Sequence, residues 1–209
     1  MSRPLVITDC DEVLLHMVRH FRDWLDVEHA IDFELGTHSF MEAMRRRGST
    51  MPMSEEEMWR YLNLFFDTEM PSQQPIAGAA AAIAELQRAA DVVILTNLQD
   101  KRNAARAEQL RDLGISARVF TNQGPKGAAL ARIVSEYAPS RAVFIDDLAV
   151  HHESVATIAP QVHRLHFCGE PAIAAHIPCA HTAGHAHARI DRWDQALPWL
   201  IETLHGETA

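Results

Sequence analysis

Two carboxylates, Asp9 and Asp11, follow a short apolar run near the start of the chain. An apolar run of this length without polar alternation is typical of a strand buried on both faces of a parallel sheet. Residues i and i+2 of an extended segment point the same way, so both acids are predicted to enter one pocket at the strand's carboxyl end, where open α/β sheets bind ligands. Two close carboxylates repel, so they need a cation, or one must hold a proton. A divalent metal with a phosphate ligand meets that need.

Further polar residues occupy comparable positions later in the chain. Apolar strands predicted at residues 92–95 and 143–145 end in Thr96 and Asp146, and Lys126 opens a predicted helix after a Gly-Pro turn. The carboxyl ends of parallel strands share one edge of a sheet, so an acid, a hydroxyl and a second acid are expected there. A lysine in the first helical turn opposes the helix macrodipole, and an anion bound there would remove the conflict.

Each of these residues also has a purely structural interpretation. Thr96 and Asn97 are typical of the start of a turn, and Asp147 can cap the next helix. Lys126 can be a solvated surface lysine. The order and spacing of the whole set favour a functional interpretation over these alternatives.

The elements that position these residues alternate regularly after residue 76. Alternation of strand and helix predicts βαβ units, and hence an α/β fold with a doubly wound parallel sheet. Strands are expected at residues 5–8, 91–97, 117–122, 141–147, 162–167 and 188–190, and helices at residues 76–90, 99–113, 126–137, 148–158 and 191–204.

Between the first strand and this alternation, residues 16–75 carry a helical hydrophobic period. They predict a small all-helical cap domain of about three helices, hinged near His16 and Pro75. The core would then comprise residues 1–15 and 76–209.

Two capping-box patterns support helices inside this insert. Ser54 and Glu57 have the spacing that begins a helix, and Ser39 and Glu42 have it too. Gly48 would end the helix that begins at Ser39.

Composition limits the classes of partner. The chain has 209 residues and a net charge of −9, which argues against a nucleic-acid polymer or an anionic membrane as the main partner but leaves small phosphorylated metabolites open. Three cysteines form no disulfide framework and indicate a reducing compartment. We find no signal peptide and no apolar run near the roughly 20 residues that span a bilayer, so a cytoplasmic location is expected. The oligomeric state stays open.

The motifs together resemble those of the haloacid dehalogenase-like (HAD) superfamily of phosphohydrolases. The resemblance covers the core, and the insert lies where that family has a helical cap. Glu12 stands where glycine is usual, and Gly127 follows the lysine where proline is common. The matching segments are Asp9-x-Asp11-x-Val13, Thr96, Lys126 and Asp146-Asp147.

The resemblance implies a mechanism and a cofactor. Asp9 would be the nucleophile that forms an aspartyl phosphate, and Asp11 the general acid and base. The implied phosphate-binding residues are Thr96, Asn97 and Lys126. The implied Mg²⁺ ligands are Asp9, the backbone carbonyl of Asp11, Asp146 and Asp147.

Other functions remain open at this point. The dehalogenase branch of the family lacks the second aspartate, so Asp11 favours phosphate chemistry. A phosphotransferase or mutase would use the same scaffold. A phospho-accepting signalling domain also gathers acids, threonine and lysine at strand ends, although it would have an adjacent acidic pair early in the chain. A non-catalytic binding protein is the fourth alternative.

Three weaker features have alternative interpretations. The run at residues 45–47, all arginine, could recognise an acidic substrate or could be the solvated last turn of a helix. Cys10 is predicted to pack into the sheet. His181, His185 and His187 resemble metal ligands, but Pro178 and Gly184 break any helix that would align them, so a polar loop is favoured.

Overall fold

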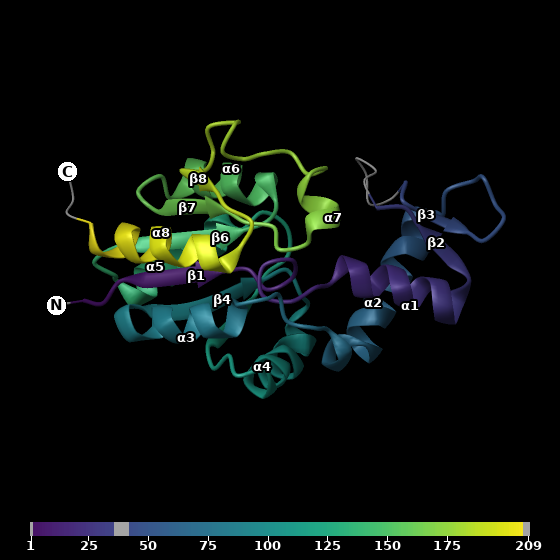
Figure 1. Ribbon diagram of the computed structural model, residues 1–209, viewed down its shortest axis with the longest axis horizontal. Coiled ribbons are helices and arrows are strands. Elements are labelled where there is room, and N and C mark those ends of the chain that lie inside the picture. Colours follow the sequence, from purple (N-terminus) through teal and green to yellow (C-terminus); the bar gives the residue numbers. More distant parts are fainter. Residues whose placement is uncertain (1, 36–41, 207–209) are drawn as a thin grey trace.

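A parallel sheet forms the centre of the molecule. The computed structural model describes residues 2–35 and 42–206, and within them six parallel strands pair in the order β5-β4-β1-β6-β7-β8 (Figure 1). This order places β1 between β4 and β6, at the point where the connections reverse direction across the sheet. The strands are β1 (Leu5–Thr8), β4 (Asp91–Thr96), β5 (Arg118–Thr121), β6 (Ala142–Asp146), β7 (His163–His166) and β8 (Ala188–Arg189).

Helices cover both faces of the sheet. Val6 of β1 packs with α3 (Ala79–Ala89) and α8 (Trp193–His205), whereas its neighbours Leu5 and Ile7 pack with α5 (Gly127–Tyr137) and α6 (Ala149–Ile158). The alternation follows from the two-residue period of a strand, and both faces are apolar because both are covered. The doubly wound parallel α/β prediction is confirmed.

The remaining core elements are short or lie at the sheet edge. Helix α4 (Asn103–Asp112) follows a 3₁₀ turn, η2 (Asp100–Arg102), and Gly114, with a φ of +82°, ends the pair as predicted. Helix α7 (Pro171–Ala174) falls in a segment where no element was predicted.

The segment between β1 and α3 is not all helical. It contains α1 (Val18–His29), α2 (Glu55–Thr68), a 3₁₀ turn η1 (Met70–Ser72) and an antiparallel pair, β2 (Ile31–Phe33) with β3 (Met44–Arg46). The prediction of an all-helical cap with about three helices is therefore wrong. Figure 1 shows this segment beyond the end of β1, beside the core.

The predicted middle helix is replaced by strand β3. Ser39 lies outside the described residues, but the chain is extended at Met44–Arg46, and Gly48 lies in a turn rather than at a helix end. Met44 packs into the same hydrophobic cluster as Ile31 and Phe33 of β2. Strands of three residues are too short to show a two-residue period in the sequence. The second capping box is confirmed: Ser54 and Glu57 bond reciprocally at the start of α2.

The insert has a hydrophobic cluster of its own. Phe65 of α2 is fully buried, and its ring lies 5.2 Å from the ring of Phe21 and 5.7 Å from that of Trp24, both on α1. Edge-to-face aromatic contacts of this kind add to the free energy gained by burial. Phe66 of α2 is buried as well, whereas Trp59 on the same helix is half exposed.

Two linkers join the insert to the core and run side by side. His16 donates its backbone N–H to the carbonyl of Gln74 over 2.9 Å, and Ile76 donates to Leu14 over 2.8 Å. The chain therefore enters and leaves the insert through a paired two-stranded connection. None of the described helices is long and apolar enough to cross a membrane.

Phe65→Ala should destabilise the protein strongly. Truncating a fully buried aromatic side chain to alanine typically lowers the free energy of unfolding by about 3–5 kcal/mol. Chemical denaturation, followed by tryptophan fluorescence, measures the loss. Leu64→Ala, at the neighbouring and 40% exposed position, is the matched control and should change stability far less. Equal losses in the two variants would contradict the packing described for α1 and α2.

Candidate active site

A buried lysine lies between two buried carboxylates at the carboxyl edge of the sheet. Lys126 Nζ is 2.8 Å from Asp9 Oδ2 and 2.7 Å from Asp146 Oδ2, and all three side chains are 10% exposed or less. Asp9 follows β1, Asp146 ends β6, and Lys126 is the residue before α5. Adjacent parallel strands bring the two acids together, and the start of α5 brings the lysine to both.

The charges in this group depend on one another. Burial raises the pKa of Asp9 to about 7, although Lys126 opposes the shift. Burial also acts to raise the pKa of Asp146, but Lys126 outweighs it and holds that pKa below its usual range. The two carboxylates keep the pKa of Lys126 above its usual value despite its burial. The lysine is therefore a fixed cation, and Asp146 is its ionised partner.

Asp147 adds a third buried carboxylate. Burial, with the charges of Asp146 and Asp9, raises the pKa of Asp147 well above its usual value. The proposed cap role for Asp147 is wrong, because Leu148 occupies the N-cap position of α6 and Asp146 Oδ1 accepts the Leu148 N–H over 2.9 Å.

These three acids fit a divalent metal. Asp9, Asp146 and Asp147 each offer one carboxylate oxygen, and the three oxygens lie within 4.8 Å of one another. Buried carboxylates that cannot all stay ionised without a cation are the environment that Mg²⁺, with its preference for oxygen ligands, satisfies.

Asp11 is held by residues that the sequence analysis missed. Arg106 of α4 donates from Nη2 to both carboxylate oxygens of Asp11, over 3.1 and 3.2 Å, and Gln73 donates to Oδ1 over 3.1 Å. Arg106 is fully buried, and it also contacts Cys10 Sγ over 3.3 Å. Cys10 packs in the core as predicted. Asp11 is thereby fixed by an ion pair in which one guanidinium nitrogen contacts both carboxylate oxygens.

Thr96 and Asn97 lie at the end of β4 with different surroundings. Thr96 is buried, and its hydroxyl oxygen has no hydrogen-bond partner within the described part of the chain. A buried hydroxyl is rarely left unpaired, so this atom is available to a ligand. Asn97 is exposed and bonds to the carbonyl of Gly124 over 3.0 Å and to Asn122 over 2.9 Å, which ties together the loops after β4 and β5.

Glu12 shapes the turn that follows the two aspartates. Its φ of +59° lies in the left-handed region that favours glycine, the residue usual at this position in the family that the sequence resembles. The cost is offset because Glu12 Oε1 accepts the backbone N–H groups of Met17 (2.9 Å) and Val18 (2.6 Å) at the start of α1. Glu12 thus replaces glycine and also caps the first helix of the insert.

Gly127 is required by close helix packing. A Cβ atom at this position would lie 2.5 Å from the backbone oxygen of Ser154 on α6. The close approach of α5 to α6 helps to set the position of the preceding Lys126.

A cavity of about 460 Å³ opens above the acids, between the insert and the core. Its core wall includes five of the predicted site residues, which are Asp9, Asp11, Thr96, Asn97 and Asp147. Its insert wall is mostly apolar and includes Met17, Val18, Met58, Trp59, Leu62 and Phe66.

The weaker candidates lie elsewhere. The arginines at 45–47 belong to β3 and the following turn rather than to a helix end, and they pair with acidic residues of the insert, as in the contact of Arg46 with Glu57 at 2.5 Å. His181 and His187 bond to backbone groups in the loop before α8, in line with the predicted polar loop.

The fold is shared with solved structures of low sequence identity. A haloacid dehalogenase-like hydrolase from Streptococcus pneumoniae superposes with a TM-score of 0.66 at 10% identity, over 96% of this chain and 98% of that one. The chain has the haloacid dehalogenase-like fold. The sequence matches no protein-family model and no curated relative.

Two further structures with the HAD-like fold cover nearly the whole chain. A candidate β-phosphoglucomutase from Thermotoga maritima has a TM-score of 0.63 at 13% identity, over 95% of this chain and 99% of that one. A candidate phosphoglycolate phosphatase from Haemophilus somnus 129pt has a TM-score of 0.65 at 11% identity, over 94% and 97%.

Lys126→Met should destabilise the chain by about 3–5 kcal/mol, because it leaves Asp9 and Asp146 buried without their shared cation. Thermal and chemical denaturation measure the change. Lys101, the only other lysine, makes an exposed contact with Asp67 at 3.4 Å, so Lys101→Met is the matched control and should have a much smaller effect. A loss no greater than that of the control would contradict the buried ion-pair arrangement.

Proposed function

We propose that this chain is a Mg²⁺-dependent hydrolase of a small phosphate monoester, acting through an aspartyl phosphate on Asp9. The observation that carries the proposal is the contact of Lys126 with both Asp9 and Asp146 at the sheet edge, below a cavity into which Asp11 and Thr96 also face. Cation, acids and a free hydroxyl are the groups needed to hold a phosphoryl group and to transfer it.

Each side chain has a separate task in the first half of the reaction. Asp9 Oδ1 accepts the N–H of Cys10 over 2.7 Å, which fixes the carboxylate, and its other oxygen would attack phosphorus. The bond between phosphorus and the alcohol oxygen breaks, and Asp11, which would have to be protonated at the start of this step, donates its proton to that oxygen. Lys126 and the Thr96 hydroxyl would bind the phosphoryl oxygens.

In the second half, Asp11 takes a proton from water as the water oxygen attacks phosphorus. The bond between phosphorus and Asp9 then breaks, which releases phosphate and regenerates the carboxylate. Mg²⁺ held by Asp9, Asp146 and Asp147 would neutralise negative charge on the phosphoryl group. Arg106 and Gln73 orient Asp11 for both steps.

The cavity indicates what kind of alcohol leaves. Apart from the acids of the core wall, the described lining carries the acidic Glu55 and no arginine or lysine. A substrate with a second anionic group would therefore find no counter-charge there, whereas an apolar or neutral alcohol would contact Met58, Trp59 and Phe66. We expect a phosphorylated metabolite whose alcohol is uncharged.

Release of inorganic phosphate tests this function directly. The full chain, assayed against a panel of phosphate monoesters with and without Mg²⁺, should release phosphate only with Mg²⁺ and should prefer esters of uncharged, apolar alcohols over phosphoglycolate. Transfer of the phosphoryl group to a second substrate molecule without free phosphate would instead establish a phosphotransferase or mutase. No turnover of any ester under either condition would refute both.

Substitution of Asp9 and substitution of Asp11 should impair different steps of the reaction. Asp9→Asn should abolish turnover and phosphoenzyme formation, since an amide is a poor nucleophile. Asp11→Asn should lower turnover by about 10²–10⁴-fold but still allow phosphorylation by an ester with a good leaving group. The measurement is trapping of labelled phosphoenzyme, with Asp23→Asn, on the exposed face of α1, as the control. Label on the Asp9→Asn protein would place the nucleophile elsewhere.

A further inference from the structure

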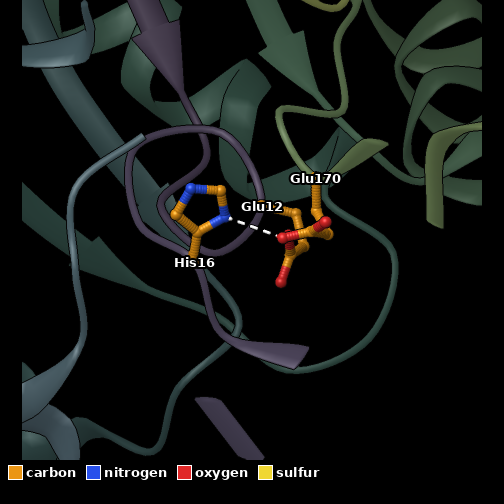
Figure 2. Close-up of side chains that lie close together, drawn as sticks. All are labelled: Glu12, His16 and Glu170. Carbon is orange, nitrogen blue, oxygen red and sulfur yellow. Dashed lines mark ion pairs between the residues drawn. The ribbon is translucent and has the colours of Figure 1, made fainter. Parts of the chain in front are cut away.

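Three side chains from separate segments meet beside the entry to the insert. Glu12 lies in the turn after β1, His16 lies in the linker to α1, and Glu170 precedes α7. Figure 2 shows the imidazole of His16 facing the carboxylates of the two glutamates. Each residue offers one ligand atom to this cluster, and these three atoms lie within 4.8 Å of one another.

Glu12 Oε2 is the atom that points to a ligand. The Glu12 residue is only 2% exposed, and its Oε1 is engaged by the N–H groups of Met17 and Val18. Its Oε2, by contrast, is buried and has no hydrogen-bond partner among the residues that the structure describes. Buried carboxylate oxygens are normally paired, so this one calls for a partner that the described residues do not supply.

Glu170 is held in the same way. Its Oε1 accepts the Ala172 N–H over 3.2 Å, and its Oε2 faces His16 Nδ1 at 3.1 Å. In both glutamates a backbone N–H therefore anchors one oxygen and turns the other toward the cluster. Outer hydrogen bonds orient the ligands of metal sites in this manner.

We propose that Glu12, His16 and Glu170 bind a divalent transition-metal ion, at a site separate from the one formed by Asp9, Asp146 and Asp147. One imidazole nitrogen with two carboxylate oxygens suits Zn²⁺, Mn²⁺, Fe²⁺ or Co²⁺ better than Mg²⁺, which takes oxygen ligands. Ligand atoms about 2.1 Å from a Zn²⁺ ion lie within about 4 Å of one another, so small side-chain rotations suffice.

One cation competes for the same position. Arg19 Nε is 3.4 Å from Glu170 Oε2, but the Arg19 side chain is 47% exposed and can turn toward solvent. Removing it in Arg19→Gln should tighten metal binding. The bound ion would join the turn after β1, the linker and the loop after β7, so it would fasten the entry of the insert to the core independently of the reaction proposed above.

The test counts Zn²⁺ ions bound to the full-length chain after dialysis. Asp146→Asn removes the site at Asp9, and this variant should retain about one Zn²⁺ per chain. Adding Glu170→Gln or His16→Asn should release that ion, whereas adding His20→Asn should not. His20 is the matched control because its Nε2 lies 3.6 Å from Glu69 Oε2 within the same insert. Circular dichroism confirms that each variant is folded.

A second readout identifies the ligand nitrogen. With Mn²⁺ as the probe, pulsed electron paramagnetic resonance of the Asp146→Asn variant should show coupling to an imidazole nitrogen, and His16→Asn should abolish it. Zn²⁺ retained after Glu170→Gln, or no Zn²⁺ bound to Asp146→Asn, would overturn the proposal. If Asp146→Asn does not fold, Glu170→Gln in the otherwise unchanged chain should bind one Zn²⁺ fewer than His20→Asn, and equal numbers would overturn it.

Discussion

Repulsion among buried carboxylates is the constraint around which this molecule is built. Asp9, Asp146 and Asp147 lie at neighbouring strand ends, and within residues 2–35 and 42–206 only the Lys126 ammonium forms an ion pair with them, contacting two of the three. The lysine reaches that position because α5 begins beside both strands and packs closely on α6, which a side chain at residue 127 would prevent. The sheet brings three carboxylates together, and the start of α5 places the Lys126 ammonium beside two of them. One ammonium does not neutralise three carboxylates, so a metal ion could bind there as well.

The insert is attached to this site through charge rather than through apolar contact alone. Arg102 at the end of η2 donates to Asp67 of α2 over 2.7 Å, and Arg106 of α4 holds Asp11, so these consecutive elements contact both the insert and Asp11. Arg106 also lies 5.8 Å from the ring of Phe66, which lines the cavity. Phe66 of α2 therefore lies against the arginine that holds Asp11, so the packing of α2 contributes to the surroundings of that carboxylate.

Much of the fold could be predicted from the sequence because its signals are local. Apolar runs that end in Asp9, Thr96 and Asp146 mark the strands and their carboxyl edge, and Gly114 marks a helix end. The hairpin β2–β3 could not be predicted, since three-residue strands show no period. Arg106 was missed because a buried arginine that pairs with a residue 95 positions away has no local signature. The one signal in the sequence was the four-residue spacing between Arg102 and Arg106, and many solvent-exposed helices have the same spacing.

The turn at Glu12 helps to determine how the first helix of the insert, α1, is oriented relative to β1. Its carboxylate accepts backbone N–H groups at the start of α1, and its own backbone lies in the turn that follows β1 and Asp9, so one residue helps to set the angle between α1 and β1. Helix α1 has 12 residues and is about 18 Å long, so a rotation of about 10° at this turn displaces its far end by about 3 Å. A chimaera that places the insert on another core would therefore also need the turn at Glu12, because α1 alone does not fix its orientation relative to the core.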